Sequence, residues 1–292
     1  MNVALTGDAA VAAAVARARD VTLASYVLWP GSPVERALER AGDRGARVSV
    51  TLDGQPYRGG RGPSGLARVN RRSVGALRRH DVDARLTASG DAPLHLKAAV
   101  VDGTAYLDAR NWTGDGRDPV VSTRDPAAVA AVSAALAGRA AVAPPRDLAL
   151  DKARALQLEA GAIRRAAGPR VDVQSESFGY SCVYDALLER ATHGGGVRLL
   201  VAAREFAGRG HASERSALRR LRAAGVEVRV SASDEKLCVG GDRGWVGSAN
   251  ATYSAGSMRD WGLRTRDPAL LGGLEARFQA TWSSARPPRG LT

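Results

Sequence analysis

The sequence predicts an α/β protein built from two tandem copies of one domain. Three pairs of segments match in the same order along the chain: 21–54 with 171–203, 77–89 with 221–233, and 121–136 with 263–278. The offset within a pair drifts only between about 139 and 151 residues, as loops of unequal length would cause. A period of this size is too long for a solenoid repeat, so a duplicated domain explains it.

Each matched pair also predicts the same elements. The first reads as strand, loop, amphipathic helix, Gly-bearing turn and apolar strand; the second as a helix end entering a strand; the third as strand, turn and helix. Strands alternating with helices favour a mostly parallel sheet in each copy. The seam is expected near 140–148, with a charged helix from about Leu148 to Ala167 bridging the copies. The predicted organisation is a first half at 1–143, a linker helix at 144–168 and a second half at 169–292.

Length and composition exclude several protein classes. The 292 residues, 45% hydrophobic and 25% charged, suffice for a conventional core. No apolar run approaches the ~18 residues of a membrane-spanning helix, so no stable membrane insertion is expected. Two cysteines argue against a disulfide framework, and the first twenty residues lack the pattern of a signal peptide. These features predict a cytoplasmic protein, although a chain trimmed of an export signal would look the same.

The net charge of +12 admits two explanations. A positive field attracts phosphate-bearing partners, nucleic acid first and anionic lipid surfaces second. Alternatively, a high genomic G+C content fills the surface with Arg, since all but three of the 42 basic residues are Arg. Charge alone therefore does not identify a partner.

Residue types that commonly take part in catalysis recur at matching points of the two copies. In both, a Lys precedes an Asn by 14 residues, although the chain has only three Lys and four Asn. The first copy also has the pattern H-x-K-x4-D, and the second has G-S-A-N. The residues concerned are His95, Lys97, Asp102 and Asn111 in the first copy, and Lys236, Ser248 and Asn250 in the second.

This pattern resembles the phospholipase D superfamily, whose members carry H-x-K-x4-D and a downstream G-S-x-N in each of two halves. The resemblance spans nearly the whole chain. It implies an α/β fold of two phospholipase D-like halves about a pseudo-two-fold axis, with the site at their interface. It also implies metal-independent, cofactor-free phosphodiester chemistry, in which one His forms a phosphohistidine and a second His protonates the leaving group and then activates water.

The resemblance assigns a role to each residue of the motif. His95 becomes the nucleophile, and Asp102 holds the turn of the motif. An anionic phosphodiester needs cations and amide donors around its non-bridging oxygens before an imidazole can attack it. The residues implied to bind the phosphate in this way are Lys97, Asn111, Lys236, Ser248 and Asn250.

The chain departs from the superfamily pattern in each half. The first half has Asp108 and Ala109 where Gly-Ser is expected. The second has Asp234 in place of the second His, and Gly241 at the acid position. Asp234 is then either the general acid and base of one asymmetric site or the mark of a decayed site. An aspartate is normally ionised at neutral pH, so it would serve activated leaving groups best.

Other polar residues complete the predicted site. In the superfamily a carboxylate after each motif orients a catalytic His; Asp118 and Asp260 stand at matching places, and the sequence does not choose between them. His211 follows a strand end and could replace the missing His, or is an ordinary surface residue. Four arginines lie in equivalent loops of the two copies: Arg58, Arg61, Arg204 and Arg209. They either contact a longer phosphate polymer or are merely solvated.

The sequence therefore predicts a metal-independent phosphodiesterase acting through a phosphohistidine at His95. The positive charge and the absence of spanning segments favour nucleic acid, DNA or RNA, over phospholipid as substrate. The alternative is a catalytically weakened protein that binds phosphate-bearing ligands without turnover. The sequence gives no oligomeric state.

Overall fold

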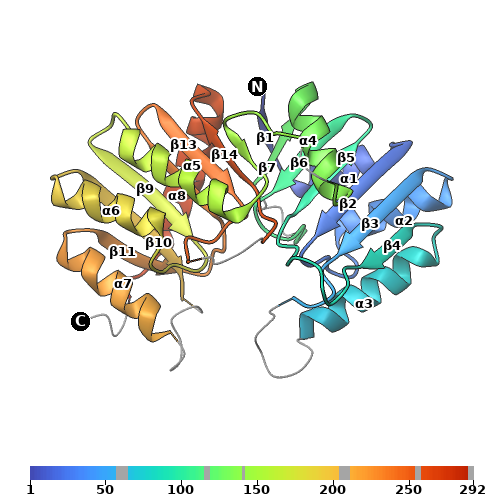
Figure 1. Ribbon diagram of the computed structural model, residues 1–292, viewed down its shortest axis with the longest axis horizontal. Helices are drawn as coiled ribbons and strands as arrows, with labels where there is room; N and C mark the ends of the chain where they lie inside the picture. Colours follow the sequence, from blue (N-terminus) through green and yellow to red (C-terminus); the bar gives the residue numbers. More distant parts are fainter. Residues whose placement is uncertain (57–64, 115–118, 140–141, 204–210, 254–257, 289–292) are drawn as a thin grey trace. The chain divides into compact units, whose positions relative to one another are not determined.

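The computed structural model describes residues 1–56, 65–114, 119–139, 142–203, 211–253 and 258–288. They form two compact units (Figure 1). The first comprises Met1–Arg146 with Ser257–Trp261, and the second comprises Asp147–Gly256 with Gly262–Thr292. A short stretch of the second sequence copy thus belongs to the first unit.

Each unit contains one mixed sheet of seven strands. In the first unit the strand order is β1-β7-β6-β5-β2-β3-β4. Its elements are β1 (Ala4–Thr6), α1 (Asp8–Val15), β2 (Asp20–Ser25), α2 (Pro33–Asp43), β3 (Arg47–Leu52), α3 (Gly65–Arg78), β4 (Asp83–Leu86), β5 (Ala98–Val101), β6 (Thr104–Asp108), β7 (Val120–Thr123) and α4 (Pro126–Leu136).

The second unit repeats this plan. Read from β8, its strand order is β8-β14-β13-β12-β9-β10-β11, which matches the first sheet position by position. Its elements are β8 (Leu148–Ala149), α5 (Lys152–Arg165), β9 (Arg170–Ser175), α6 (Cys182–Thr192), β10 (Gly196–Ala202), α7 (Ala212–Ala223), β11 (Glu227–Ser231), β12 (Leu237–Gly240), β13 (Arg243–Gly247), β14 (Gly262–Thr265) and α8 (Pro268–Ser284). The predicted α/β fold with two tandem halves is confirmed.

The prediction of a mostly parallel sheet is wrong. Among the described strands, only β2–β3 and β3–β4 pair in parallel in the first unit, and only β9–β10 and β10–β11 in the second. The strands β5, β6 and β7 are joined by connections whose described residues contain no helix, and they pair antiparallel. Asp102 and Gly103, with φ of 43° and 78°, make the tight turn between β5 and β6.

Residues 144–168, which the sequence analysis assigns to a linker helix, contain β8 and α5 of the second unit. The helix α5 occupies the place that α1 has in the first unit. Its apolar side chains, among them Leu156 and Ile163, are buried in the core of the second unit. An amphipathic helix is stabilised by burying its apolar face, and α5 finds that partner within its own unit.

Local sequence signals explain where the last helix of each unit begins. Asp125 and Asp267 cap α4 and α8 by accepting hydrogen bonds of 2.9 to 3.0 Å from backbone N–H groups of the first turn. Pro126 and Pro268 follow as the first helical residues, where the missing N–H costs nothing. Both copies keep the segment TRDP because it starts this helix.

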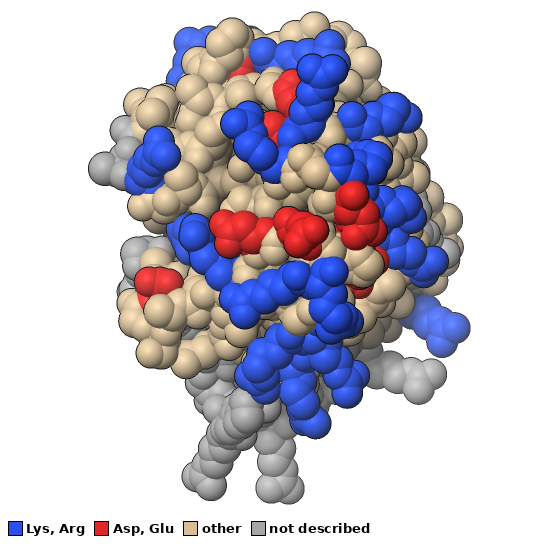
Figure 2. Space-filling model, turned by 90° about the vertical axis from the view of Figure 1, so that its right-hand side faces the viewer, with Lys and Arg blue, Asp and Glu red and all other residues tan. Residues whose placement is uncertain are grey.

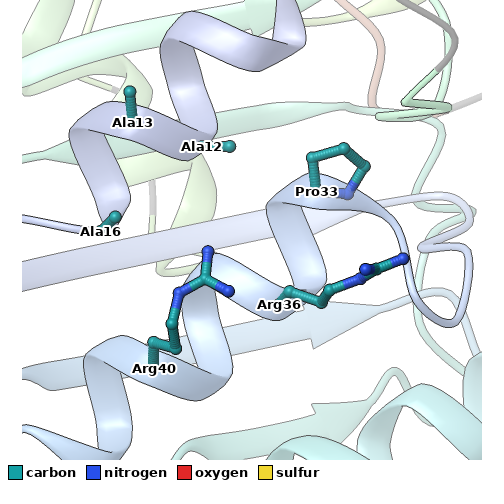
Figure 3. A pocket seen from close by; sticks show the side chains of 6 residues that line it. All are labelled: Ala12, Ala13, Ala16, Pro33, Arg36 and Arg40. Atoms are coloured by element: carbon teal, nitrogen blue, oxygen red, sulfur yellow. The ribbon is translucent and has the colours of Figure 1, made fainter.

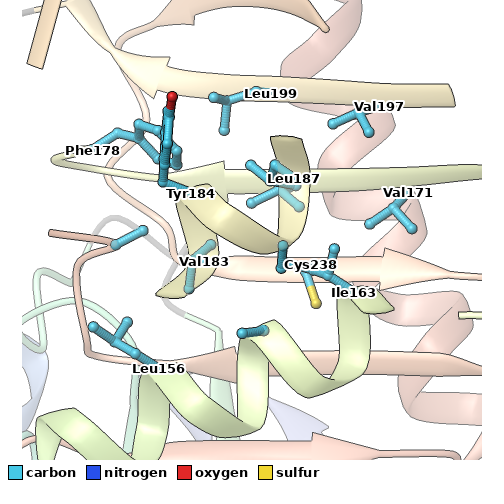
Figure 4. Packing of buried hydrophobic residues seen from close by; sticks show 14 of the residues in the cluster. Leu156, Ile163, Val171, Phe178, Val183, Tyr184, Leu187, Val197, Leu199 and Cys238 are labelled. Carbon is cyan, nitrogen blue, oxygen red and sulfur yellow. The ribbon is translucent and has the colours of Figure 1, made fainter. Parts of the chain in front are cut away.

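Helices cover both faces of each sheet (Figure 1). In the second unit, α5 and α6 pack on one face, where Cys238 of β12 lies among Leu156, Ile163 and Leu187 (Figure 4). On the other face, α8 approaches β13 so closely that a Cβ at Gly244 would lie 2.7 Å from a methyl of Leu271. Burial on both faces makes the strands rigid supports for the polar segments that follow them.

Candidate active site

His95 lies between β4 and β5 in the first unit, and its imidazole contacts a buried carboxylate. Nδ1 of His95 is 2.7 Å from Oδ1 of Asp260. The His95 side chain is 14% exposed and that of Asp260 is fully buried. A carboxylate offers only acceptors, so this contact favours a proton on Nδ1 and leaves the lone pair on Nε2.

Backbone pairing brings Asp260 to this place across 165 residues of sequence. Leu94 and Arg259 form an isolated parallel bridge, and the Arg259 N–H donates to the carbonyl of Pro93 at 3.0 Å. Each bridged residue directly precedes one member of the His–Asp pair. Of the two orienting carboxylates considered from sequence, Asp260 makes the contact, and Asp118 lies outside the described residues.

Lys97 is completely buried beside His95. Its Nζ donates to the His95 carbonyl at 2.8 Å and lies 5.3 Å from the ring centroid of Tyr26. The Tyr26 ring in turn packs edge-on against the His95 ring, with centroids 4.8 Å apart. Sequence reasoning did not select Tyr26; the available signal was an aromatic residue directly after β2, where α/β proteins place ligand-binding groups.

Asp108, which stands where Gly is expected, shapes the loop that carries Asn111. Its carboxylate accepts hydrogen bonds from the backbone N–H groups of Arg110 at 3.0 Å and Trp112 at 2.7 Å. The Asn111 side chain follows in this loop, and its buried Oδ1 has no hydrogen-bond partner in the described part of the chain. Asp108 in place of Gly therefore does not mean that the motif has lost its structure, because the Asp108 carboxylate stabilises a turn of its own.

The second unit contains a matching lysine. Nζ of Lys236 donates to the carbonyl of Asp234 at 2.7 Å, as Lys97 does to His95. It also forms an ion pair of 2.9 Å with Oε2 of Glu176, and its side chain is only 3% exposed. Asp234 is partly buried in the segment before β12. Glu176 is a second residue that sequence reasoning missed.

Ser248 and Asn250 follow β13 in the second unit. Ser248 is fully buried. Asn250 accepts a hydrogen bond from the Ser177 N–H at 3.2 Å and donates from Nδ2 to Glu176 Oε2 at 3.5 Å. Lys236 and Asn250 therefore share one carboxylate oxygen of Glu176, which connects these two of the predicted phosphate-binding side chains.

The remaining predicted residues are less central. The Asp102 carboxylate accepts hydrogen bonds from the N–H groups of Arg19 and Asp20, which ties the β5–β6 turn to the start of β2. His211 occupies the N-cap position of α7 without a capping side-chain hydrogen bond, and its Nδ1 lies 4.0 Å from a Glu214 oxygen. The arginines predicted to contact a longer polymer lie outside the described residues: Arg58, Arg61, Arg204 and Arg209.

Other features of the described chain bear on ligands. Within the described ranges, no three His, Cys, Asp or Glu side chains are grouped as metal ligands would be. Of the helices that the structure describes, none combines the length and apolar character needed to cross a membrane. An open hollow between α1 and α2, with Arg36 and Arg40 at its side, contains none of the predicted site residues (Figure 3).

Comparison with known proteins identifies the fold. Residues 162–282 match the family model described as cardiolipin synthase, PLD-like domain. Polyphosphate kinase from Porphyromonas gingivalis superposes with a TM-score of 0.64 at 16% identity over 95% of this chain, which spans only 50% of that kinase. Phosphatidylserine synthase from Haemophilus influenzae Rd KW20 also gives 0.64, at 11% identity, over 95% of this chain and 85% of its own.

Other solved structures match only part of the chain. Nuc from Salmonella typhimurium, a phospholipase D family member, covers 49% of this chain and 98% of its own, with 19% identity and a TM-score of 0.43. No curated protein matches the chain in sequence. The predicted resemblance is confirmed by the family match and the shared fold: residues 162–282 match the model of a phospholipase D-like domain, and the two tandem α/β halves share the fold of these solved structures over 95% of the chain.

Proposed function

We propose that this protein is a metal-independent phosphodiesterase that forms a phosphohistidine at His95. The observation that carries the proposal is the contact between His95 Nδ1 and the buried Asp260 carboxylate. A nucleophilic imidazole needs its free lone pair on one nitrogen and a partner that stabilises positive charge on the other. The Asp260 carboxylate meets both needs: it holds the proton on Nδ1, so that the lone pair is on Nε2 of His95, and it stabilises positive charge on the ring.

The reaction has two steps. Nε2 of His95 attacks phosphorus, the bond to the leaving oxygen breaks, and that oxygen takes a proton from Asp234. Water then attacks the phosphohistidine, Asp234 takes its proton, and the P–N bond breaks to release the phosphate product and free His95. Each step moves one proton and needs no electron donor or acceptor.

By the resemblance to the superfamily, we assign phosphate binding to the two buried lysines and to the polar groups after β6 and β13. Lys97 and Lys236 are 0% and 2% exposed, and an ammonium in such surroundings attracts an anion more strongly than one in water. Amide and hydroxyl donors add directed hydrogen bonds. The side chains assigned to the non-bridging oxygens are Lys97, Asn111, Lys236, Ser248 and Asn250.

The first experiment measures hydrolysis of bis-p-nitrophenyl phosphate in EDTA. We expect wild-type activity that resists the chelator, and a phosphorylated His95 in acid-sensitive, base-stable form after a rapid quench. In the same assay, Asp234→Ala removes hydrolysis of a substrate with a poor leaving group and weakens it less for p-nitrophenol, which departs without a proton. Activity that disappears in EDTA and returns with a divalent metal would contradict the proposal.

A second candidate function is binding of phosphate-bearing ligands without turnover. Asp234 in place of a His favours it, because the second step lacks the usual base. Under that function wild type is inactive in the assay above and Asp234→His gains activity. Under the enzymatic function Asp234→His changes the pH dependence of an activity already present.

Nucleic acid is the substrate class that we propose. Support comes from α3, which carries four exposed arginines, Arg68, Arg71, Arg72 and Arg78, and is followed directly by a fifth, Arg79. The side of the molecule seen in Figure 2 shows Lys and Arg both above and below a band of acidic residues. Among the described residues, no carboxylate pairs with Arg68, Arg71 or Arg72. Unpaired arginines along one helix match the repeated phosphates of a nucleic-acid strand.

Replacing Arg68, Arg71 and Arg72 by Ala should weaken binding of an oligonucleotide and lower its salt dependence. Each lost phosphate contact reduces the slope of log K against log salt by about 0.7 to 0.9, so the triple variant should lose about 2. A fluorescence titration over a salt series measures this. The matched control removes three exposed arginines from α5, Arg154, Arg164 and Arg165, and has the same net charge. Equal losses in the two variants would mean that only net charge matters.

A further inference from the structure

The two units differ at one position next to each buried lysine. Tyr26 and Glu176 are the first residues after the equivalent strands β2 and β9. Tyr26 contacts Lys97 through its ring, whereas Glu176 contacts Lys236 through its carboxylate. The same place in the repeat thus holds a neutral group in one unit and a negative charge in the other.

The carboxylate of Glu176 is built into the second unit. It is 14% exposed, and its Oε2 binds both Lys236 Nζ at 2.9 Å and Asn250 Nδ2 at 3.5 Å. The Glu176 carbonyl accepts a hydrogen bond from the Ala202 N–H at 3.2 Å, which fixes the backbone beside β10. The side chain is therefore held on Lys236 and Asn250 by the fold of its own unit.

A phosphate on Lys236 would share that ammonium with Glu176. With one contact of 2.9 Å and a second of about 2.8 Å, the carboxylate oxygen and the nearest phosphate oxygen lie within about 6 Å of each other. At that separation like charges repel enough to weaken binding between about ten- and a hundredfold for each ligand charge, depending on how much water remains. A dianion suffers this penalty twice and a monoanion once.

We propose that Glu176 determines the charge of the phosphate group that the protein accepts. Its fixed negative charge favours a phosphodiester, which carries one charge, over a phosphate monoester, which carries two near neutral pH. This inference rests on the part of the proposed function that assigns Lys236 and Asn250 to phosphate binding. It adds the consequence that a terminal monoester, including a product of that kind, is bound less well than an internal diester.

The experiment compares two small ligands that differ by one methyl group and one charge. Calorimetric titration at pH 8 gives the affinities of dimethyl phosphate and methyl phosphate for wild type and Glu176→Gln. In the variant, dimethyl phosphate should bind about tenfold more tightly and methyl phosphate about a hundredfold more tightly, so their affinity ratio shifts about tenfold towards the monoester. Glu176→Met, which also removes the charge, should give the same shift and serves if the amide disturbs folding.

The control is Glu227→Gln, which removes an exposed carboxylate on β11 of the same unit and should leave the ratio unchanged. An unchanged ratio in both Glu176 variants would overturn the proposal. Weaker binding of both ligands would also overturn it, because Glu176 would then serve only to keep Lys236 charged. The titration does not require catalytic turnover. A shifted ratio of the two affinities supports the role of Glu176 even if the protein is inactive. If the protein hydrolyses phosphodiesters and the affinity ratio is unshifted, the role of Glu176 is refuted and the proposed function is not. No binding to any variant would refute both it and the phosphate clamp.

Discussion

Replacing Asp260 by Asn is expected to lower kcat for phosphodiester hydrolysis by about 10² to 10⁴, with little change in KM. The carboxylate contacts the His95 imidazole, so its replacement acts on the nucleophile, which loses its tautomer and its counter-charge. An amide can present N–H to Nδ1, which would place the histidine proton on Nε2 and remove the attacking lone pair. His95→Ala should remove the reaction altogether, leaving binding intact.

Steady-state kinetics of both variants against bis-p-nitrophenyl phosphate tests this, with His193→Ala as the control. His193 caps α6 in the second unit and is bound to the Glu189 carbonyl, so its removal should leave kcat unchanged. Asp260 is fully buried, and thermal melting must show that its variant folds. A role confined to stability would lower the melting temperature and leave kcat per folded molecule unchanged. Wild-type rates in His95→Ala would refute a nucleophilic His95.

The pairing of His95 with Asp260 shows what a duplicated sequence leaves undecided. Asp118 and Asp260 hold equivalent places in the two copies, so any argument from spacing applies to both alike. The choice depends on the bridge between Leu94 and Arg259, which joins segments far apart in sequence. Periodicity and turn chemistry reveal local elements, but a contact of this kind exists only once the chain has folded.

The internal repeat of the sequence did allow the fold to be predicted. The TRDP segments, the sequence LERA at 38–41 and 188–191, and the spacing from Lys to Asn each recur because each meets the same structural need twice. The error in strand direction came from the stretch between β4 and β7, where short turns replace helices. Comparing the copies residue by residue at 26 and 176 would have exposed Tyr26 and Glu176, since an aromatic and a carboxylate at one place in a repeat signal different electrostatic surroundings.

The second prediction with a large expected effect concerns the free energy of unfolding and the buried carboxyl group of Glu159. Glu159 lies on α5 with 1% of its surface exposed, and neither carboxylate oxygen has a hydrogen-bond partner among the described residues. Desolvation by burial raises the pKa of Glu159 well above its usual value. Its charge also helps to raise the pKa of the buried Cys238 thiol, after burial itself. An unpartnered buried polar group of this kind costs about 1 to 3 kcal/mol.

Glu159→Met should therefore raise the free energy of unfolding at pH 7 by at least about 1 to 3 kcal/mol, since Met keeps the side-chain length and the helix propensity and replaces the carboxyl group by an apolar end. The sign of the pH dependence follows from the raised pKa. At low pH both folded and unfolded chains hold the proton, and only the cost of burying the neutral carboxyl remains. As pH rises above the ordinary Glu pKa, only the unfolded chain ionises, and wild type loses stability until the folded carboxyl ionises too.

Urea unfolding of wild type and Glu159→Met from pH 4 to 8 measures the difference between them, in which all other titrating groups cancel. The advantage of the variant should be smallest near pH 4 and grow by up to about 1.4 kcal/mol per pH unit above the ordinary Glu pKa. Glu275→Met, at an exposed position of α8, is the control and should show no such slope. A difference that stays constant with pH would mean that Glu159 ionises as readily in the folded protein as in the unfolded chain. Its carboxylate would then have to be solvated or paired in solution, and α5 would have to loosen from the core that buries it.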